Sequence, residues 1–244
     1  MSERISRADA GGVCTLTLNR PDKLNALDMA AFEALDGHLA ALEADEGIGC
    51  VILRGAGRAF CAGADLNALD GASERPPRFK PGVIERLAHL PKPVIAAVHG
   101  VCFTGGLELA LACDFILADA TARFADTHGK WGLVASWGMT QRLPRRIGLS
   151  PAKRMMMTAR TVEAAEAASL GLVDLLADEG GLDDLVHTFA GELLAHSWFT
   201  NAANKRLLLE TDGMSLAEGV AHEYFRHPGR APDWRERIDR FRRG

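Results

Sequence analysis

The chain has 244 residues, of which 48% are hydrophobic and 25% are charged, and its formal net charge is −4 at pH 7. This length and composition indicate a sizeable buried core, and they exclude a disordered tail, a collagen-like fibre and a small disulfide-stabilised protein. The slight acidic excess excludes a general basic surface for nucleic acid.

The cysteines and the apolar runs indicate an intracellular compartment. The five cysteines are an odd number without a Cys-x-x-Cys pair, and most lie in apolar runs, which favours reduced core thiols. The first twelve residues are polar and predict no secretory signal. The longest apolar runs are far shorter than the roughly 18 residues of a membrane span. We therefore expect a cytoplasmic protein with no membrane or nucleic-acid partner.

The first part of the chain alternates between strand and helix patterns, which predicts an α/β fold. Asp28 is placed to cap a helix whose apolar residues recur at intervals of three and four. The segment 68–80 is polar, contains two adjacent prolines and predicts a mobile loop. Strands are expected at residues 13–18, 50–53, 93–98, 115–117 and 123–125, and a loop of glycine and other small residues is expected at 55–64.

Beyond about residue 180 the pattern is helical, with helices expected at 182–196, 202–210 and 232–243. Ser150 and Pro151 predict an N-cap followed by a proline at the first helical position. Ser215 and Glu218 have the spacing of a capping box. The sequence leaves open whether this region packs on its own core or on a neighbouring subunit through the apolar residues Leu216, Val220, Tyr224 and Phe225.

Two loops could bind an anionic oxygen. The segment 60–66 is rich in small residues, which let a ligand approach the main chain, although taken alone it fits a tight turn capped by Asp65 better. Gly105 and Gly106 are expected to begin a helix and leave backbone N–H groups uncovered. Glu108 follows within an apolar run, where it could instead compensate the helix dipole. Together the two loops predict an oxyanion hole beside a general acid/base.

A series of short motifs occurs in order between about residues 12 and 175. They are Asn19-Arg20-Pro21, LNAL at 24–27, RAFCAGADL at 58–66, KPVIAAVHG at 92–100, GGLELA at 105–110, TQRLP at 140–144 and ASLGLVD at 168–174. This ordered set resembles the crotonase family, also called the enoyl-CoA hydratase/isomerase superfamily. The resemblance implies a crotonase-like spiral of ββα units over residues 1–190. It also implies a C-terminal helical region at 191–244 that is used for trimerisation.

The resemblance further implies an acyl-CoA substrate, no separate cofactor because coenzyme A is part of the substrate, and a homotrimer or dimer of trimers. By position, the backbone N–H groups of Ala64 and Gly105 would hold the enolate-like thioester oxygen. Lys23 or Arg58 would lie near the phosphates, although Lys23 could simply be a solvated side chain. Phe241 would reach the coenzyme A of an adjoining subunit. The substrate-binding residues implied are Lys23, Leu24, Ala26, Ala62, Asp65, Leu66 and Phe241.

One position departs from the two-carboxylate hydratases of this family, whose second Glu follows a Phe by four residues. Here that position is His128, counted from Phe124. Imidazole can donate or accept a proton near neutrality, so a pair of Glu108 and His128 could hydrate an enoyl thioester. His128 could also merely fill space or bind a backbone carbonyl. If the segment is extended, Asp126 points to the opposite face, and we rank it below His128.

The sequence thus predicts a lyase of fatty acid metabolism that adds water to a 2-enoyl-CoA through Glu108 and His128. A double-bond isomerase, a decarboxylase or a hydrolase of an acyl-CoA remains open because only one carboxylate is retained. A protein that binds acyl-CoA or RNA without turnover is a third reading. Trp131 and Trp137 could narrow the acyl pocket or belong to the core. The sequence lacks His-x-His and His-Glu-x-x-His motifs, so no metal is expected.

Overall fold

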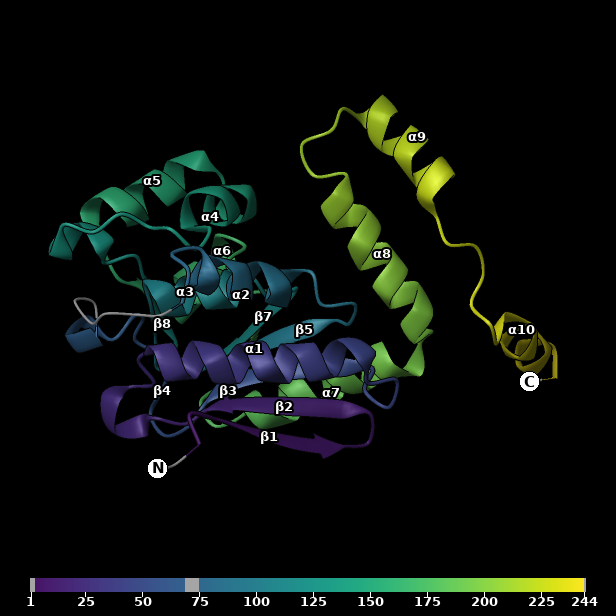
Figure 1. Cartoon of the computed structure of the whole chain (residues 1–244), viewed down its shortest axis with the longest axis horizontal. Coiled ribbons are helices and arrows are strands. Elements are labelled where there is room, and N and C mark those ends of the chain that lie inside the picture. Colours follow the sequence, from purple (N-terminus) through teal and green to yellow (C-terminus); the bar gives the residue numbers. More distant parts are fainter. Residues whose placement is uncertain (1–2, 69–74, 244) are drawn as a thin grey trace.

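The computed structural model describes residues 3–68 and 75–243 and contains two β-sheets surrounded by helices (Figure 1). The larger sheet has the order β1-β2-β3-β5-β7-β10, in which only β1 and β2 pair antiparallel. The smaller sheet has the order β4-β6-β8-β9, in which only β8 and β9 pair antiparallel. The strands are β1 Ile5–Ala10, β2 Val13–Leu18, β3 Cys50–Gly55, β4 Ala59–Cys61, β5 Val94–Val98, β6 Val101–Phe103, β7 Phe115–Asp119, β8 Arg123–Ala125, β9 Val162–Glu163 and β10 Leu175–Ala177.

A ββα unit repeats along the chain, as expected for the predicted spiral. In each unit the first strand joins the larger sheet and the second joins the smaller one, before a helix follows. Gly100 makes the bend between β5 and β6 with a φ of +56°, and a Cβ there would lie 2.1 Å from the Arg58 carbonyl oxygen. Only glycine fits this bend. The helices of the three units are α2 Phe79–Ala88, α3 Gly105–Leu111 and α4 Met139–Ile147.

The larger sheet is buried on both faces, which explains why its parallel strands are apolar runs. Val51 and Leu53 of β3 face the main core, whereas Cys50 and Ile52 face a smaller core beneath α7 (Leu182–Ala195). On the main-core side, α1 (Met29–Ala44) begins at Asp28, whose side chain accepts a hydrogen bond from the Ala31 amide at 2.9 Å. The predicted N-cap is therefore confirmed.

Four local expectations differ from the structure. Strand β1 was not expected in the polar N-terminal segment, where Ile5 is its one fully buried side chain. The loop expected at 55–64 contains β4. Of the loop expected at 68–80, residues 69–74 lie outside the described residues and the end is already part of α2. Helix α5 (Leu149–Thr158) has Gly148 as its N-cap, so the cap expected at Ser150 is wrong.

The remaining helices are α6 (Ala164–Ser169), α8 (Trp198–Glu210), α9 (Leu216–Arg226) and α10 (Trp234–Arg243). Helix α8 is attached to the core by Lys205, whose buried ammonium group lies 2.7 Å from Asp114 Oδ2 and donates to the Lys92 carbonyl oxygen at 3.0 Å. Helices α9 and α10 lie beyond α8, away from both sheets (Figure 1). The predicted boundary at residue 190 falls inside α7.

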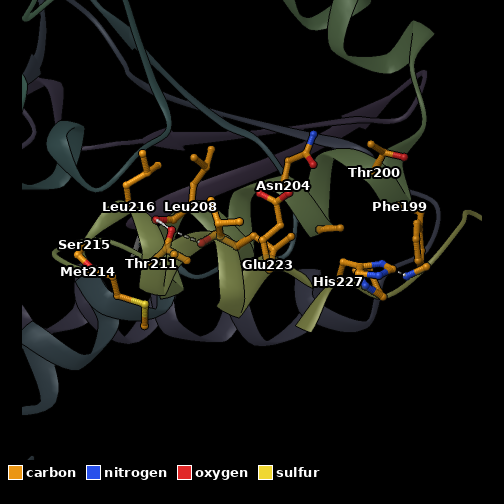
Figure 2. Close-up of a pocket in the computed structure, with 16 residues that line it drawn as sticks. Phe199, Thr200, Asn204, Leu208, Thr211, Met214, Ser215, Leu216, Glu223 and His227 are labelled. Atoms are coloured by element: carbon orange, nitrogen blue, oxygen red, sulfur yellow. Dashed lines mark hydrogen bonds between the residues drawn. The ribbon is translucent and has the colours of Figure 1, made fainter. Parts of the chain in front are cut away.

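Helix α9 begins with the predicted capping box of Ser215 and Glu218. Its apolar side chains do not pack on the core of the same chain, since Leu216 is 85% exposed and Tyr224 is 72% exposed. A groove of about 630 Å³ separates α8 from α9. Figure 2 shows Leu208 and Leu216 at one end of this groove and His227 at the other. No helix within residues 3–68 and 75–243 is long and apolar enough to cross a membrane.

Candidate active site

Two backbone amides meet where the loop after β4 approaches the start of α3. A Cβ on Gly105 would lie 3.3 Å from the Ala64 nitrogen, and a Cβ on Gly63 would lie 3.2 Å from the Gly105 nitrogen. Within the described ranges, the amides of Ala64 and Gly105 donate no hydrogen bond to the protein. Two free N–H groups this close together could hold one negatively charged oxygen.

The Ala64 amide is aimed by a parallel bridge to Leu27. The Leu27 amide donates to the Gly63 carbonyl at 2.8 Å, and the Asp65 amide donates to the Leu27 carbonyl at 2.9 Å. In a parallel bridge the residue between the two that form the hydrogen bonds, here Ala64 between Gly63 and Asp65, has its N–H on the side of the strand away from the partner. The Ala64 N–H therefore points away from Leu27.

The loop that precedes this bridge is held by a buried amide side chain. Asn25 is 1% exposed, has a φ of +56° and donates to the carbonyl oxygens of Ala56 and Ala59. Its own oxygen accepts from the Arg20 amide at 2.9 Å. The Arg20 guanidinium lies 3.0 Å from Asp65 Oδ2. Burial opposes ionisation of Asp65, but the hydrogen bonds from Arg20 and Asn67 outweigh it and lower its pKa.

Glu108 lies one turn after Gly105 on the same face of α3 and is 1% exposed. Its Oε1 accepts hydrogen bonds from the Trp137 amide at 2.8 Å and the Met139 amide at 3.2 Å. Burial raises the pKa of Glu108, and the two amides and His128 only partly offset that effect. The raised pKa brings the carboxyl closer to the range in which it can exchange protons near neutrality.

The structure brings His128 close to Glu108. Its Nε2 lies 3.8 Å from Glu108 Oε2, which is an ion-pair distance but too long for a hydrogen bond. The expectation that Asp126 points to the opposite face assumed an extended segment, and that assumption is wrong. Strand β8 ends at Ala125 and a short 3₁₀ helix, η3 (His128–Trp131), begins at His128, so the segment is not extended. Asp126 Oδ1 instead lies 2.6 Å from His128 Nδ1.

The two carboxylates set the charge of His128. Burial opposes protonation of the ring, but the hydrogen bond to Asp126 and the charges of Asp126 and Glu108 outweigh it, so the pKa of His128 is raised. The imidazolium form is therefore more populated near neutrality than in a free histidine. The site therefore places an imidazole whose protonated form is favoured beside a buried carboxyl group.

Thr104 connects the start of α3 to the segment that bears His128. It precedes Gly105 with φ +52° and ψ −112°, an unusual conformation for a β-branched residue. Its hydroxyl lies 2.5 Å from the Thr127 hydroxyl and accepts from the Thr127 amide at 3.1 Å. Because Thr127 adjoins His128, this contact fixes His128 relative to the start of α3.

The two tryptophans differ in environment. A Cβ on Gly105 would lie 2.4 Å from the Trp137 ring, which also packs edge-on against Phe32 with a centroid distance of 4.9 Å. Trp137 therefore packs against the core, and its ring also lies close to Gly105. Trp131 is 58% exposed.

The residues expected to bind coenzyme A divide into two groups. Ala62 bonds through its amide to the Leu24 carbonyl at 2.9 Å, which places the first group beside Ala64. Lys23, in a 3₁₀ turn, and Leu66 are exposed, whereas Leu24, Ala26, Ala62 and Asp65 are half-buried. Phe241 is 84% exposed on α10, at the opposite end of the molecule from β4 (Figure 1). In a single chain it does not join the others.

Sequence reasoning did not identify several groups that build the site. The amides of Trp137 and Met139 cannot be identified from residue type, since any residue but proline carries an N–H. Asn25 belongs to the LNAL motif at 24–27, and its amide side chain between Leu24 and Ala26 was a signal from which a structural role could have been predicted. In the part of the chain that the structure describes, no group of three or more His, Cys, Asp or Glu residues could hold a metal ion.

Comparisons with known proteins identify the family of the chain. The family model of enoyl-CoA hydratase/isomerase matches residues 8–240. The 1,2-epoxyphenylacetyl-CoA isomerase of Escherichia coli is 35% identical over 240 residues, covering 94% of this chain and 92% of the relative. A probable enoyl-CoA hydratase of Rhizobium meliloti is 37% identical over 227 residues, covering 87% of this chain and 84% of the relative. The crystal structure of an enoyl-CoA hydratase from Bacillus anthracis superposes with a TM-score of 0.91 at 32% identity, covering 98% of this chain and 96% of that one. The chain therefore belongs to the enoyl-CoA hydratase/isomerase family.

Proposed function

We propose that the protein adds water reversibly to a 2-enoyl-CoA, with Glu108 and His128 as the acid/base pair and the amides of Ala64 and Gly105 as donors to the thioester oxygen. One observation carries this proposal: two free amides lie together at the start of the helix that also bears Glu108, and His128 lies 3.8 Å from that carboxylate. Donors fixed before the reaction stabilise the negative charge that develops on the oxygen.

The charges of the pair suggest which group takes and which gives the proton. The Glu108 carboxylate removes a proton from water while the water oxygen bonds to Cβ of the enoyl group. The electron pair of the double bond moves toward the thioester carbonyl, whose oxygen is held by the two amides. The imidazolium of His128 then gives its Nε2 proton to Cα, and the carbonyl re-forms. All protons come from water and side chains, so this route needs no cofactor.

The second candidate is a double-bond isomerase that uses the same oxyanion-stabilising amides. A single imidazole could remove a proton from one carbon of the acyl chain and return it to another. The Escherichia coli relative is named as an isomerase of a CoA thioester, which favours an isomerase over a decarboxylase or a hydrolase. Isomerisation leaves the product mass unchanged, whereas hydration adds one water.

We further propose that a second copy of the chain covers the exposed apolar side chains of α9, in a homotrimer or a dimer of trimers. In such an assembly Phe241 would contact the substrate of a neighbouring subunit. Five unpaired, buried cysteines fit a reducing compartment such as the cytoplasm.

The test is Glu108→Gln, assayed with crotonyl-CoA through the loss of its conjugated enoyl thioester absorbance. The amide keeps an oxygen for the Trp137 and Met139 amides but cannot take a proton, so kcat should fall by at least about a hundredfold. Glu163→Gln, at an exposed carboxylate in β9, is the matched control and should keep wild-type turnover. Wild-type hydration by Glu108→Gln would refute the assignment. A 3-enoyl-CoA and a malonyl-type thioester, followed by product mass, test the alternatives.

A further inference from the structure

The Asp126 carboxylate is buried, yet it takes no part in the proposed chemistry. Asp126 is 2% exposed at the end of β8. Burying a carboxylate is unfavourable unless hydrogen bonds compensate for the lost water. Within the described part of the chain, both hydrogen bonds that this carboxylate accepts come from His128. One is from Nδ1 at 2.6 Å and one from the His128 amide at 3.1 Å.

These contacts define two different sides of the imidazole ring. Nδ1 faces Asp126, and Nε2 faces Glu108 at 3.8 Å. Within the described residues, Asp126 from the end of β8 and Glu108 from α3 are the charged groups that contact the ring. The Thr104 hydroxyl also bonds to Thr127, so the backbone between Asp126 and His128 is held in place.

We propose that Asp126 is a positioning residue that keeps a proton on His128 Nδ1 and thereby makes Nε2 the nitrogen that exchanges a proton with the substrate. The inference rests on the proposed function and adds a residue to it. A carboxylate can only accept here, so the neutral ring carries its hydrogen on Nδ1 and presents the Nε2 lone pair to the reacting atoms. In the protonated ring, the Nε2–H group is directed at the reacting atoms.

The proton transfer then has one defined path. As the enolate returns to the thioester, its carbon–carbon π electrons form the new Cα–H bond. The Nε2–H bond breaks, its electron pair stays on Nε2, and the ring becomes neutral while Nδ1–H remains on Asp126. The negative charge of Asp126 favours the protonated ring before this step.

The variant Asp126→Asn tests this role because it keeps the shape of the side chain and removes its charge. We expect kcat with crotonyl-CoA to fall about tenfold or more and KM to stay within about twofold of wild type, given the usual size of acid/base contributions. The alkaline limb of kcat/KM should move to lower pH, because the hydrogen bond and the charge of Asp126 raise the pKa of His128. Asp119→Asn is the matched control, because Asp119 is also buried and, among the described residues, its carboxylate accepts hydrogen bonds from Thr121 alone.

A second readout does not depend on turnover. In protein labelled with isotopic histidine, nuclear magnetic resonance reports the tautomer and the titration of the His128 ring, which is assigned by its loss in His128→Gln. We expect wild type to show the Nδ1–H tautomer and Asp126→Asn to titrate at lower pH. An unchanged titration together with an unchanged kcat/KM profile would refute the positioning role, even if Glu108→Gln still abolished hydration. If Asp126→Asn changes the titration of His128 but the wild-type protein hydrates no enoyl-CoA, the hydratase proposal is refuted instead. Asp126 then remains the group that orients the ring.

Discussion

Gly105→Ala is the substitution for which the structure gives the sharpest expectation. Gly105 has no positive φ, so its backbone accepts alanine without strain. Space is the obstacle, because the new Cβ would lie 2.4 Å from Trp137 Cζ3 and 3.3 Å from the Ala64 nitrogen. Carbon atoms pack best at about 3.5–4.0 Å, so the ring would have to retreat by roughly 1 Å or more.

The Trp137 ring has little freedom to retreat. It packs against Phe32, and the Trp137 amide donates to Glu108 Oε1 at 2.8 Å, so a shift of this residue also disturbs the acid. Overpacking of this kind costs about 1–3 kcal/mol of unfolding free energy. We expect kcat to fall by about a hundredfold, comparable to the loss of one oxyanion donor.

The assay combines urea unfolding with turnover of crotonyl-CoA. The matched control is Gly82→Ala in α2, where a Cβ meets no atom within 4 Å. The Gly82→Ala variant should gain up to about 1 kcal/mol of unfolding free energy from the higher helix propensity of alanine, and it should keep full activity. The double variant Gly105→Ala with Trp137→Leu should recover part of the lost stability, and a double-mutant cycle measures the coupling. Full turnover by Gly105→Ala alone would refute the placement of the thioester oxygen at this amide.

Two further substitutions test the scaffold around the site. Thr104→Gly relieves the unusual backbone conformation but removes both hydroxyl contacts to Thr127, so we expect little net change in the urea midpoint and a several-fold lower kcat. The control Thr104→Ser keeps the hydroxyl and should keep the activity. Equal kcat values in the two variants would contradict the role of the hydroxyl. Lys205→Met removes the cation beside the carboxylate of Asp114, whose pKa is already raised by burial. The variant should lose about 3 kcal/mol of unfolding free energy near neutrality. Because the pKa of Asp114 would rise further, this loss should shrink as the pH falls and Asp114 becomes protonated; a loss that is constant with pH would contradict the reasoning.

Local patterns were sufficient to predict the elements whose determinants lie close together in the sequence. The cap at Asp28 and the capping box at Ser215 depend on residues within one helical turn, and both are confirmed. Glu108 was identified because a carboxylate in an apolar run needs a specific reason to be buried. Strand β1 was missed because an edge strand of a hairpin has a polar outer face and so lacks an apolar run.

The position of Asp126 could not be predicted because it depends on contacts between distant segments. The chain leaves the extended conformation after Ala125, where Thr127 bonds to Thr104, 23 residues earlier in the sequence. Local propensity contains no information on that contact. The two amides that hold Glu108 were equally hidden, since they lie 29 and 31 residues downstream of it.

The bridge between Leu27 and Ala64 means that the direction of the Ala64 N–H, a proposed donor to the thioester oxygen, depends on a residue almost forty positions upstream of it. If the Ala64 amide is a donor to the thioester oxygen, as proposed, exchanges at Arg20 or Asn25 should lower the reaction rate, because these residues hold the loop before the bridge. A library restricted to residues around the bound acyl group would overlook them. For engineering the rate independently of substrate preference, this N-terminal loop is the region to vary.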